Sequence, residues 1–236
     1  MKKLTRNING CYEIDGQFYP SVTTITKVLE KEGLHNWIAQ TAVDYYENTI
    51  VGAVLEGINL EAIKKEAVNA HKTEARDAAD FGSLVHNAID LYHKTQAWPI
   101  EPTVKEKFEQ AIEWEQSVKL AVANSEITVH SLTHRYAGTL DLECFADLGD
   151  GEKHGLMDWK NSSGFYPEWK YQIAAYVGAW EEMNPGKYLD FGGIGVIDKK
   201  LGKFKPYIFQ RAELIIPYQM FLCLCQFNHL KDWGKK

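Results

Sequence analysis

The segment YAGTLDLECFADLGDGEKHGLMDWKN, residues 136–161, contains two partly apolar stretches on either side of the turn-rich sequence GDGEK. Polar and apolar residues alternate in both stretches, and a period of two is typical of half-buried strands. The turn predicts that the two strands pair as an antiparallel hairpin. EITVHSL, residues 126–132, has the same period. We therefore predict a meander of three strands over residues 126–161.

The chain before the meander has a mostly helical pattern. Apolar residues recur at the helical spacings of three and four over residues 35–55, 59–95 and 103–122. Nearer the N-terminus, CYEIDGQFY (residues 11–19) predicts a small hairpin that turns at Asp15-Gly16. Ser21 then predicts the start of a helix that ends at Gly33.

After the meander we expect a helix, two strands and a closing helix. Their predicted ranges are 167–184, 191–197, 204–210 and 213–233. This order predicts an α/β fold with a central mixed β-sheet flanked by helices and a helical N-terminal region. We expect one compact unit overall, with an N-terminal hairpin and helical region over residues 1–123 and a core over residues 124–236.

The composition is that of a folded globular protein. Of 236 residues, 45% are hydrophobic, and 26 Lys and Arg against 32 Asp and Glu give a net charge of −6. That charge argues against a protein that covers duplex DNA by bulk positive charge. No apolar run suits a signal peptide or a membrane span, so we expect a cytoplasmic protein without a membrane partner. The four cysteines follow no CxxC spacing, which argues against a zinc ribbon.

Asp158-Trp159-Lys160 is the most informative motif. Residues two apart on a strand point to the same face, so the motif aims a carboxylate and an ammonium at one point. A strand-end salt bridge is the simpler interpretation. However, the hairpin can bring Asp141 beside Asp158, and two neighbouring carboxylates repel unless a cation lies between them. Mg²⁺ or Mn²⁺ suits such hard oxygen ligands.

Three further features have both a structural and a functional interpretation. Gln172 and Tyr176 are four residues apart on the predicted helix, which places them on one face. His86 follows Gly82 by about one helical turn, although a lone histidine is more often a core or surface residue. Glu126, which opens the first strand, is either an additional acidic contributor or a surface residue.

The order of four motifs resembles the PD-(D/E)XK nuclease superfamily, and its RecB-type branch fits best. The motifs are Gly82-x-x-x-His86, GTLD (138–141), DWK (158–160) and Gln172-x-x-x-Tyr176. In addition, FYPSVTTI (residues 18–25) is similar to the opening of phage exonucleases and of the mitochondrial genome maintenance exonuclease within that branch. The resemblance implies a restriction-endonuclease-like core, and it hardly covers the C-terminal part of the chain.

The resemblance also assigns roles to residues. It implies that Mg²⁺ or Mn²⁺ is held by Asp141, Asp158, the backbone carbonyl of Trp159 and, as a further ligand, His86. Lys160 would orient or deprotonate the attacking water. Gln172 and Tyr176 would steady this lysine and contact DNA.

In two respects the chain departs from the pattern of that superfamily. Members of the superfamily often have Glu where this chain has Asp158, a change that shortens the ligand and keeps its charge. The iron–sulfur members place three cysteines near the C-terminus, where this chain has only Cys223 and Cys225. We therefore expect no iron–sulfur cluster.

The expected DNA contacts are spread along the chain. They are Ser21, Thr23, Arg135, Trp169, Lys199, Lys200 and Lys203. The lysine-rich turn between the last two strands can equally be a solvated hairpin. Because base stacking on aromatic side chains needs little net charge, we expect single-stranded DNA or free DNA ends as the substrate.

Together these features predict a metal-dependent hydrolase of DNA phosphodiester bonds. The preferred hypothesis is an exonuclease in phage or bacterial DNA processing or recombination, which admits a recombination or replication protein as a partner. A structure-specific endonuclease is one alternative. The other is a DNA-binding subunit that has lost catalysis.

Overall fold

A five-stranded mixed sheet is the centre of the computed structural model, which describes residues 5–6, 11–29, 34–51, 59–99, 101–162, 164–198 and 203–231. The strands, in order across the sheet, are β4 (Ala121–Ser131), β5 (Tyr136–Asp147), β6 (Glu152–Ser162), β7 (Phe191–Asp198) and β8 (Phe204–Gln210). β4, β5 and β6 are antiparallel, β7 is parallel to β6, and β8 is antiparallel to β7. The predicted meander and the α/β class with a mixed sheet are confirmed.

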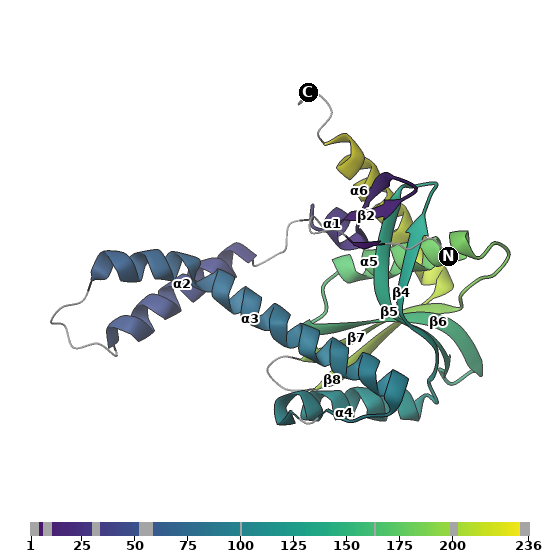
Figure 1. Ribbon diagram of the computed structural model, residues 1–236, viewed down its shortest axis with the longest axis horizontal. Coiled ribbons are helices and arrows are strands. Elements are labelled where there is room, and N and C mark those ends of the chain that lie inside the picture. Colours follow the sequence, from purple (N-terminus) through teal and green to yellow (C-terminus); the bar gives the residue numbers. More distant parts are fainter. Residues whose placement is uncertain are drawn as a thin grey trace. The chain divides into compact units, whose positions relative to one another are not determined.

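Helices pack on both faces of this sheet. They are α4 (Pro102–Ser117), α5 (Glu168–Met183) and α6 (Ile215–Leu230). Figure 1 shows α4 on one side of the sheet and α5 with α6 on the other. The main core lies on the α5 side, where Ile173, Tyr176 and Phe221 are almost fully buried. On the α4 side, the rings of Trp159 and Trp114 meet edge to face with their centroids 6.1 Å apart.

Two glycines let large side chains lie directly on the strands. A Cβ atom at Gly138 would overlap the ring of Tyr176, and one at Gly195 would overlap the ring of Trp159. Any larger residue at either position would push the aromatic ring away from the sheet. The glycine of the GTLD motif is therefore required by the packing of α5.

The N-terminal hairpin is confirmed. A second, three-stranded sheet contains β1 (Thr5–Arg6), β2 (Cys11–Ile14) and β3 (Gln17–Pro20). Between β2 and β3, Asp15 and Gly16 have φ values of 52° and 74°, the left-handed conformation that a two-residue hairpin turn uses. The hydroxyl of Tyr12 lies 3.0 Å from that of Thr139 on β5 and connects the hairpin to the central sheet.

The next helix begins as predicted and ends earlier. Ser21 caps α1 (Val22–Thr26), since its hydroxyl accepts a hydrogen bond from the Thr24 N–H at 3.0 Å. The helix stops at Thr26, and β-branched threonines, which favour helices weakly, account for this short length. The expected end at Gly33 lies outside the described residues.

The two long N-terminal helices are α2 (Leu34–Val51) and α3 (Leu60–Thr95). α3 is one uninterrupted helix of 36 residues, and the Asn59 side chain caps it by accepting a hydrogen bond from the Ala62 N–H at 3.1 Å. α2 and the first part of α3 contact each other through the hydroxyl of Tyr45, which donates to Glu66 at 2.7 Å.

The chain divides into two compact units. One contains residues 30–84, and the other contains residues 1–29 together with 85–236. This division differs from the boundary that we expected at residue 123. The sheet, the last turns of α3 and the candidate site described below all belong to the second unit.

The junction between α4 and β4 differs from the prediction. The helix expected to reach residue 122 ends at Ser117, and the strand expected from residue 126 begins at Ala121. The Leu120 N–H donates to the Glu115 carbonyl at 2.8 Å, and Lys119 has a φ of 50°, a conformation that ends a helix. Apolar residues around this point fit the period of a helix and of a strand equally well.

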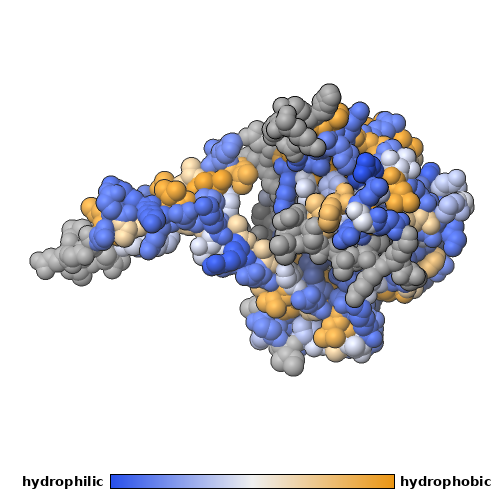
Figure 2. Space-filling view, turned by 45° about the horizontal axis from the view of Figure 1, so that its top comes forward, coloured by the Kyte–Doolittle hydropathy of each residue, from blue (hydrophilic) through white to orange (hydrophobic). Residues whose placement is uncertain are grey.

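The closing helix follows a short 3-10 turn, Arg211–Leu214, and starts two residues later than predicted. On the face drawn in Figure 2, hydrophobic residues occur in small groups among hydrophilic ones. None of the helices in the described part of the chain is long and apolar enough to span a bilayer.

Candidate active site

Asp158 and Lys160 form an ion pair at the centre of the site. The ammonium of Lys160 contacts Oδ2 of Asp158, and the two side chains are 20% and 4% exposed. Both residues lie on β6 and share a face because they are two apart. This pair therefore places a carboxylate in the protein interior with one cation beside it, as the salt-bridge interpretation of the motif requires.

Asp141 joins this pair where β5 and β6 separate. The two strands are paired as far as Leu142 and Met157, and Asp141 and Asp158 are the next residues on each strand. One carboxylate oxygen of Asp141 accepts the backbone N–H of Trp159 at 2.5 Å. This side chain thus satisfies a donor that the strand ladder no longer uses. The structure brings Asp141 to the backbone between Asp158 and Lys160.

His86 contacts the other oxygen of Asp141. Its Nδ1 lies 3.1 Å from Oδ1 of Asp141. Burial disfavours a charged imidazole, but the hydrogen bond to Asp141 and the negative charges of Asp141 and Asp158 outweigh burial and raise the pKa of His86. α3 therefore delivers His86 to the same point as the two strands.

Burial controls the ionisation of Asp158. It raises the pKa of Asp158, the charge of Lys160 opposes that rise, and the charge of Asp141 adds to it. Asp158 has one ammonium beside it and Asp141 has a histidine, so the two largely buried carboxylates are short of positive charge. A bound cation would relieve this shortage.

Glu126 and Asp90 extend the acidic character of the site. A small cavity of about 10 Å³, large enough for roughly one water molecule or ion, is lined by His86, Asp90, Glu126 and Asp141 among others. Partial burial and the charges of Asp141 and Asp90 raise the pKa of Glu126. Of the two interpretations of Glu126, this placement favours the additional acidic contributor.

We had not expected Asp90 in the site. Its signal in the sequence was its spacing of four from His86, which places both on one helix face.

The donor atoms at this point suit a hard divalent cation. Four carboxylates, those of Asp90, Glu126, Asp141 and Asp158, interact with two ammonium groups, those of Lys94 and Lys160. Within the described ranges, however, no three His, Cys, Asp or Glu side chains form a ready-made metal cluster. The reason is visible in the contacts: Asp158 faces Lys160, and Asp141 faces His86 and the Trp159 N–H.

Gln172 and Tyr176 lie in the core beneath the site. The Gln172 amide donates to the Tyr176 hydroxyl at 2.9 Å, and both side chains are buried. Burial and the nearby charge of Asp158 raise the pKa of Tyr176 well above its usual value. The predicted stacking on one helix face is therefore present, but burial leaves neither side chain at a surface that DNA could reach.

The other expected DNA contacts do not gather at one place. Ser21 is buried and used as a helix cap, with Thr23 beside it. Trp169 is only 9% exposed and packs against Phe165 and Tyr166, so it belongs to the core.

The remaining candidates are basic residues. Arg135 is exposed and donates to Gln17 at 3.2 Å. Lys203 is exposed, whereas Lys199 and Lys200 lie outside the described residues.

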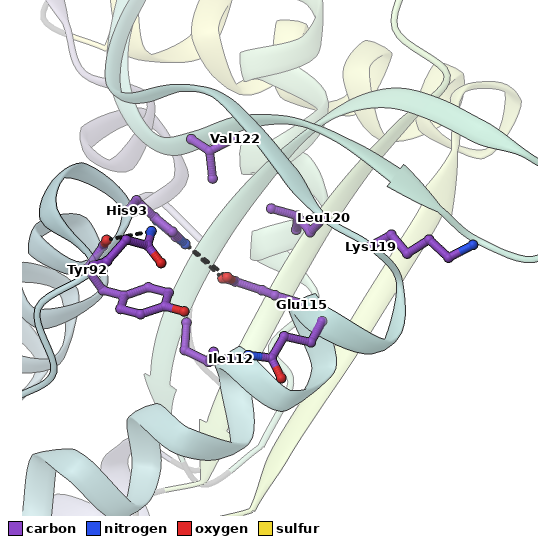
Figure 3. A pocket seen from close by; sticks show the side chains of 9 residues that line it. Tyr92, His93, Ile112, Glu115, Lys119, Leu120 and Val122 are labelled. Carbon is purple, nitrogen blue, oxygen red and sulfur yellow. Dashed lines mark hydrogen bonds and ion pairs between the residues drawn. The ribbon is translucent and has the colours of Figure 1, made fainter.

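A larger cavity of about 340 Å³ lies next to the site (Figure 3). His93 from α3 and Glu115 from α4 meet across it, with Nε2 of His93 2.9 Å and 3.2 Å from the two carboxylate oxygens. His93 also lines the small cavity at Asp141. No sequence motif pointed to this buried pair, because its two members are 22 residues apart on different helices.

No protein-family model matches the chain, and no curated protein matches it in sequence. Among solved structures it is similar to an alkaline exonuclease from Laribacter hongkongensis, with 12% identity, a TM-score of 0.37, and coverage of 92% of this chain and 93% of that one. A structure of the same exonuclease with dAMP covers 85% and 98%, at 10% identity and a TM-score of 0.31. The protein SSO0001 is similar at 11% identity and a TM-score of 0.35, over 90% and 85%. Similarity at this level carries no argument about activity.

Proposed function

We propose that the protein is a metal-dependent nuclease of the PD-(D/E)XK type that hydrolyses phosphodiester bonds in DNA. It acts as an exonuclease on single-stranded or free DNA ends, in phage or bacterial DNA processing or recombination. One observation carries the proposal: Asp141 and Asp158 meet at the Trp159 backbone where β5 and β6 separate, with Lys160 alongside.

Asp141 and Asp158 hold Mg²⁺ or Mn²⁺ in this proposal, together with the Trp159 carbonyl and His86. When bound, the cation lowers the pKa of water and neutralises negative charge that grows on the phosphate. The shortage of positive charge around the two carboxylates supports such a cation, because a polyanionic substrate would otherwise be repelled.

Lys160 has the role of handling the attacking water. The Lys160 side chain is 20% exposed, so its ammonium can hydrogen-bond both to Asp158 and to a water beside the substrate. From there the ammonium donates a hydrogen bond that orients the water, and only the neutral amine, formed after the lysine has released a proton to solvent, can accept the proton of that water. Asp158 holds the lysine in place through the ion pair.

A digestion experiment tests the proposal. Linear single-stranded DNA labelled at one end and a closed single-stranded circle are incubated with the protein in Mg²⁺. The linear strand should be degraded from an end and the circle spared. Asp158→Asn should abolish this activity, whereas Asp150→Asn, which changes an exposed aspartate just before β6, should keep it.

Three results would contradict the proposal. Cleavage of the closed circle would identify an endonuclease. DNA binding without cleavage in Mg²⁺ or Mn²⁺ would identify a DNA-binding subunit without catalysis. Equal activity of Asp158→Asn and wild-type protein would place the chemistry elsewhere in the chain.

A further inference from the structure

α6 presents an apolar stripe to solvent. The stripe consists of Ile216, Met220, Cys223, Phe227 and Leu230. All five residues are exposed, with Ile216 62%, Met220 46%, Phe227 57% and Leu230 54% accessible. Single exposed apolar residues are common on protein surfaces, but a contiguous group of them usually marks an interaction site.

The stripe is separate from the face that anchors α6 to the protein. Pro217, Phe221 and Cys225 are the buried residues of the helix, and Cys225 donates to the His134 carbonyl at 3.3 Å. The core is therefore complete without the stripe. His229, in the last turn of α6, lies 3.2 Å from the same His134 carbonyl, so the C-terminal end of the helix is also held against the turn between β4 and β5.

The spacing of the stripe is that of a coiled-coil seam. Its members follow one another at intervals of four, three, four and three residues. This pattern keeps one side of a helix facing a second helix that crosses at a shallow angle, with side chains packed as knobs into holes. The spacing thus specifies a helix as the partner.

The absence of charged residues in α6 restricts which helix can be its partner. From Ile215 to Leu230, α6 contains no Asp, Glu, Lys or Arg. Among the described helices of more than five residues, α6 alone has this property. A partner helix with charged side chains at the seam would bury them without counter-charges, which is costly. The α6 helix of a second copy carries no such charged side chain, so it can pack against the stripe without this cost.

We propose that α6 is a self-association surface on which a second copy of this chain docks its own α6 about a two-fold axis. The stripe extends almost equally to both sides of Cys223, so pairing centred there brings the two Cys223 side chains together. Two heptads span about 21 Å of helix. An interface of that size is at the lower end of specific contacts, so a dissociation constant on the order of 10 μM is expected.

Sedimentation velocity over about 1 to 100 μM of the full chain tests this proposal. The wild-type protein should shift from monomer to dimer. Met220→Glu should weaken the dimer at least about tenfold, since it places two carboxylates in the seam. Val68→Glu is the matched control, because Val68 is an exposed apolar residue on α3, and it should leave the dimer unchanged.

Oxidation with diamide locates the contact. At protein concentrations at which the dimer forms, diamide should produce a disulfide-linked pair of chains. Cys223→Ser should abolish this product, and Cys11→Ser should still form it. Flotation with phosphatidylcholine vesicles tests the alternative occupant, a membrane surface.

Three outcomes would overturn the proposal: a monomer at every concentration, equal weakening by Val68→Glu, or vesicle binding that depends on Met220 without any dimer. DNA cleavage is a separate readout. Met220→Glu should cleave DNA like the wild type, so a failure of the dimer leaves the proposed function untouched.

Discussion

The ammonium of Lys160 is the only cation in direct contact with the Asp158 carboxylate among the described residues. A buried ion pair adds little net stability, since both ions lose hydration, but removal of one partner leaves the other uncompensated. The ion pair therefore matters more for holding the Lys160 ammonium in position than for the free energy of folding.

This asymmetry gives a prediction. Lys160→Met should lower the free energy of unfolding by up to ~3 kcal/mol, because the Asp158 carboxylate is left without its cation. The double variant Asp158→Asn with Lys160→Met should recover part of that loss. Urea unfolding without added metal measures both quantities, and strictly additive losses would show that the two groups are not coupled.

Much of the site could be predicted at the level of single residues. Asp141, Asp158 and Lys160 converge because a period of two and one hairpin determine which residues meet. Asp90 could have been found from its spacing of four from His86, but only the packing of α3 beside β4 and β5 shows that this helix face lines the site. The contact between His93 and Glu115 could not be predicted from the sequence, because it depends on how α3 and α4 pack.

At the scale of secondary-structure elements, the contact between β5 and α5 depends on Gly138. Gly138→Ala should destabilise the fold by about 1–3 kcal/mol, because the new methyl group overlaps the Tyr176 ring. Gly164→Ala is the control, since an added Cβ there meets no atom within 4 Å. Thermal unfolding compares the two variants, and an equal loss in both would rule out this account of the glycine.

Glu182 connects the end of α5 to the turn between β4 and β5. Its carboxylate accepts the N–H and the hydroxyl of Thr133, each at 3.0 Å. Burial alone would raise the pKa of Glu182, but hydrogen bonds from this turn, including one from Ser131, lower it.

A lowered pKa means that this stabilisation is present above the ordinary pKa of Glu and is lost as pH falls through the lowered value. Glu182→Gln should therefore melt at a lower temperature than the wild type at neutral pH. The difference should shrink in acid. Melting curves across this range test the prediction, and a difference that grows on acidification would contradict it.

The elements themselves were largely predictable, and their boundaries less so. The five strands of the central sheet follow from alternation and turn residues. The end of α4 did not, because apolar residues near Leu120 satisfy the periods of a helix and of a strand, and only the tertiary packing decides between them. The early end of α1 has a different cause, the weak helix preference of its β-branched residues.

At the scale of the whole molecule, an acidic protein must bind DNA with few phosphate contacts. With 26 basic against 32 acidic residues, we expect the affinity for a single strand to fall with salt at a logarithmic slope shallower than about −3, which corresponds to roughly four phosphates. Ca²⁺ in place of Mg²⁺ should keep the DNA intact during the titration. A slope steeper than about −5 would show that binding uses many more phosphate contacts than this account expects.

The division into two units was beyond the reach of sequence patterns. α3 has one continuous helical period, yet its first part belongs to residues 30–84 and its last turns to the unit that holds the site. Periodicity reports which face of a helix is apolar, and it does not report which neighbour covers that face.

A crystal of the protein soaked in Mn²⁺ tests the central claim most directly. Anomalous scattering should give one peak within about 2.1 Å of a carboxylate oxygen of Asp141 and of Asp158, and the peak should vanish in Asp158→Asn. A map with no peak between these two residues, or a peak that persists in the variant, would contradict the proposed metal site and the hydrolysis that depends on it.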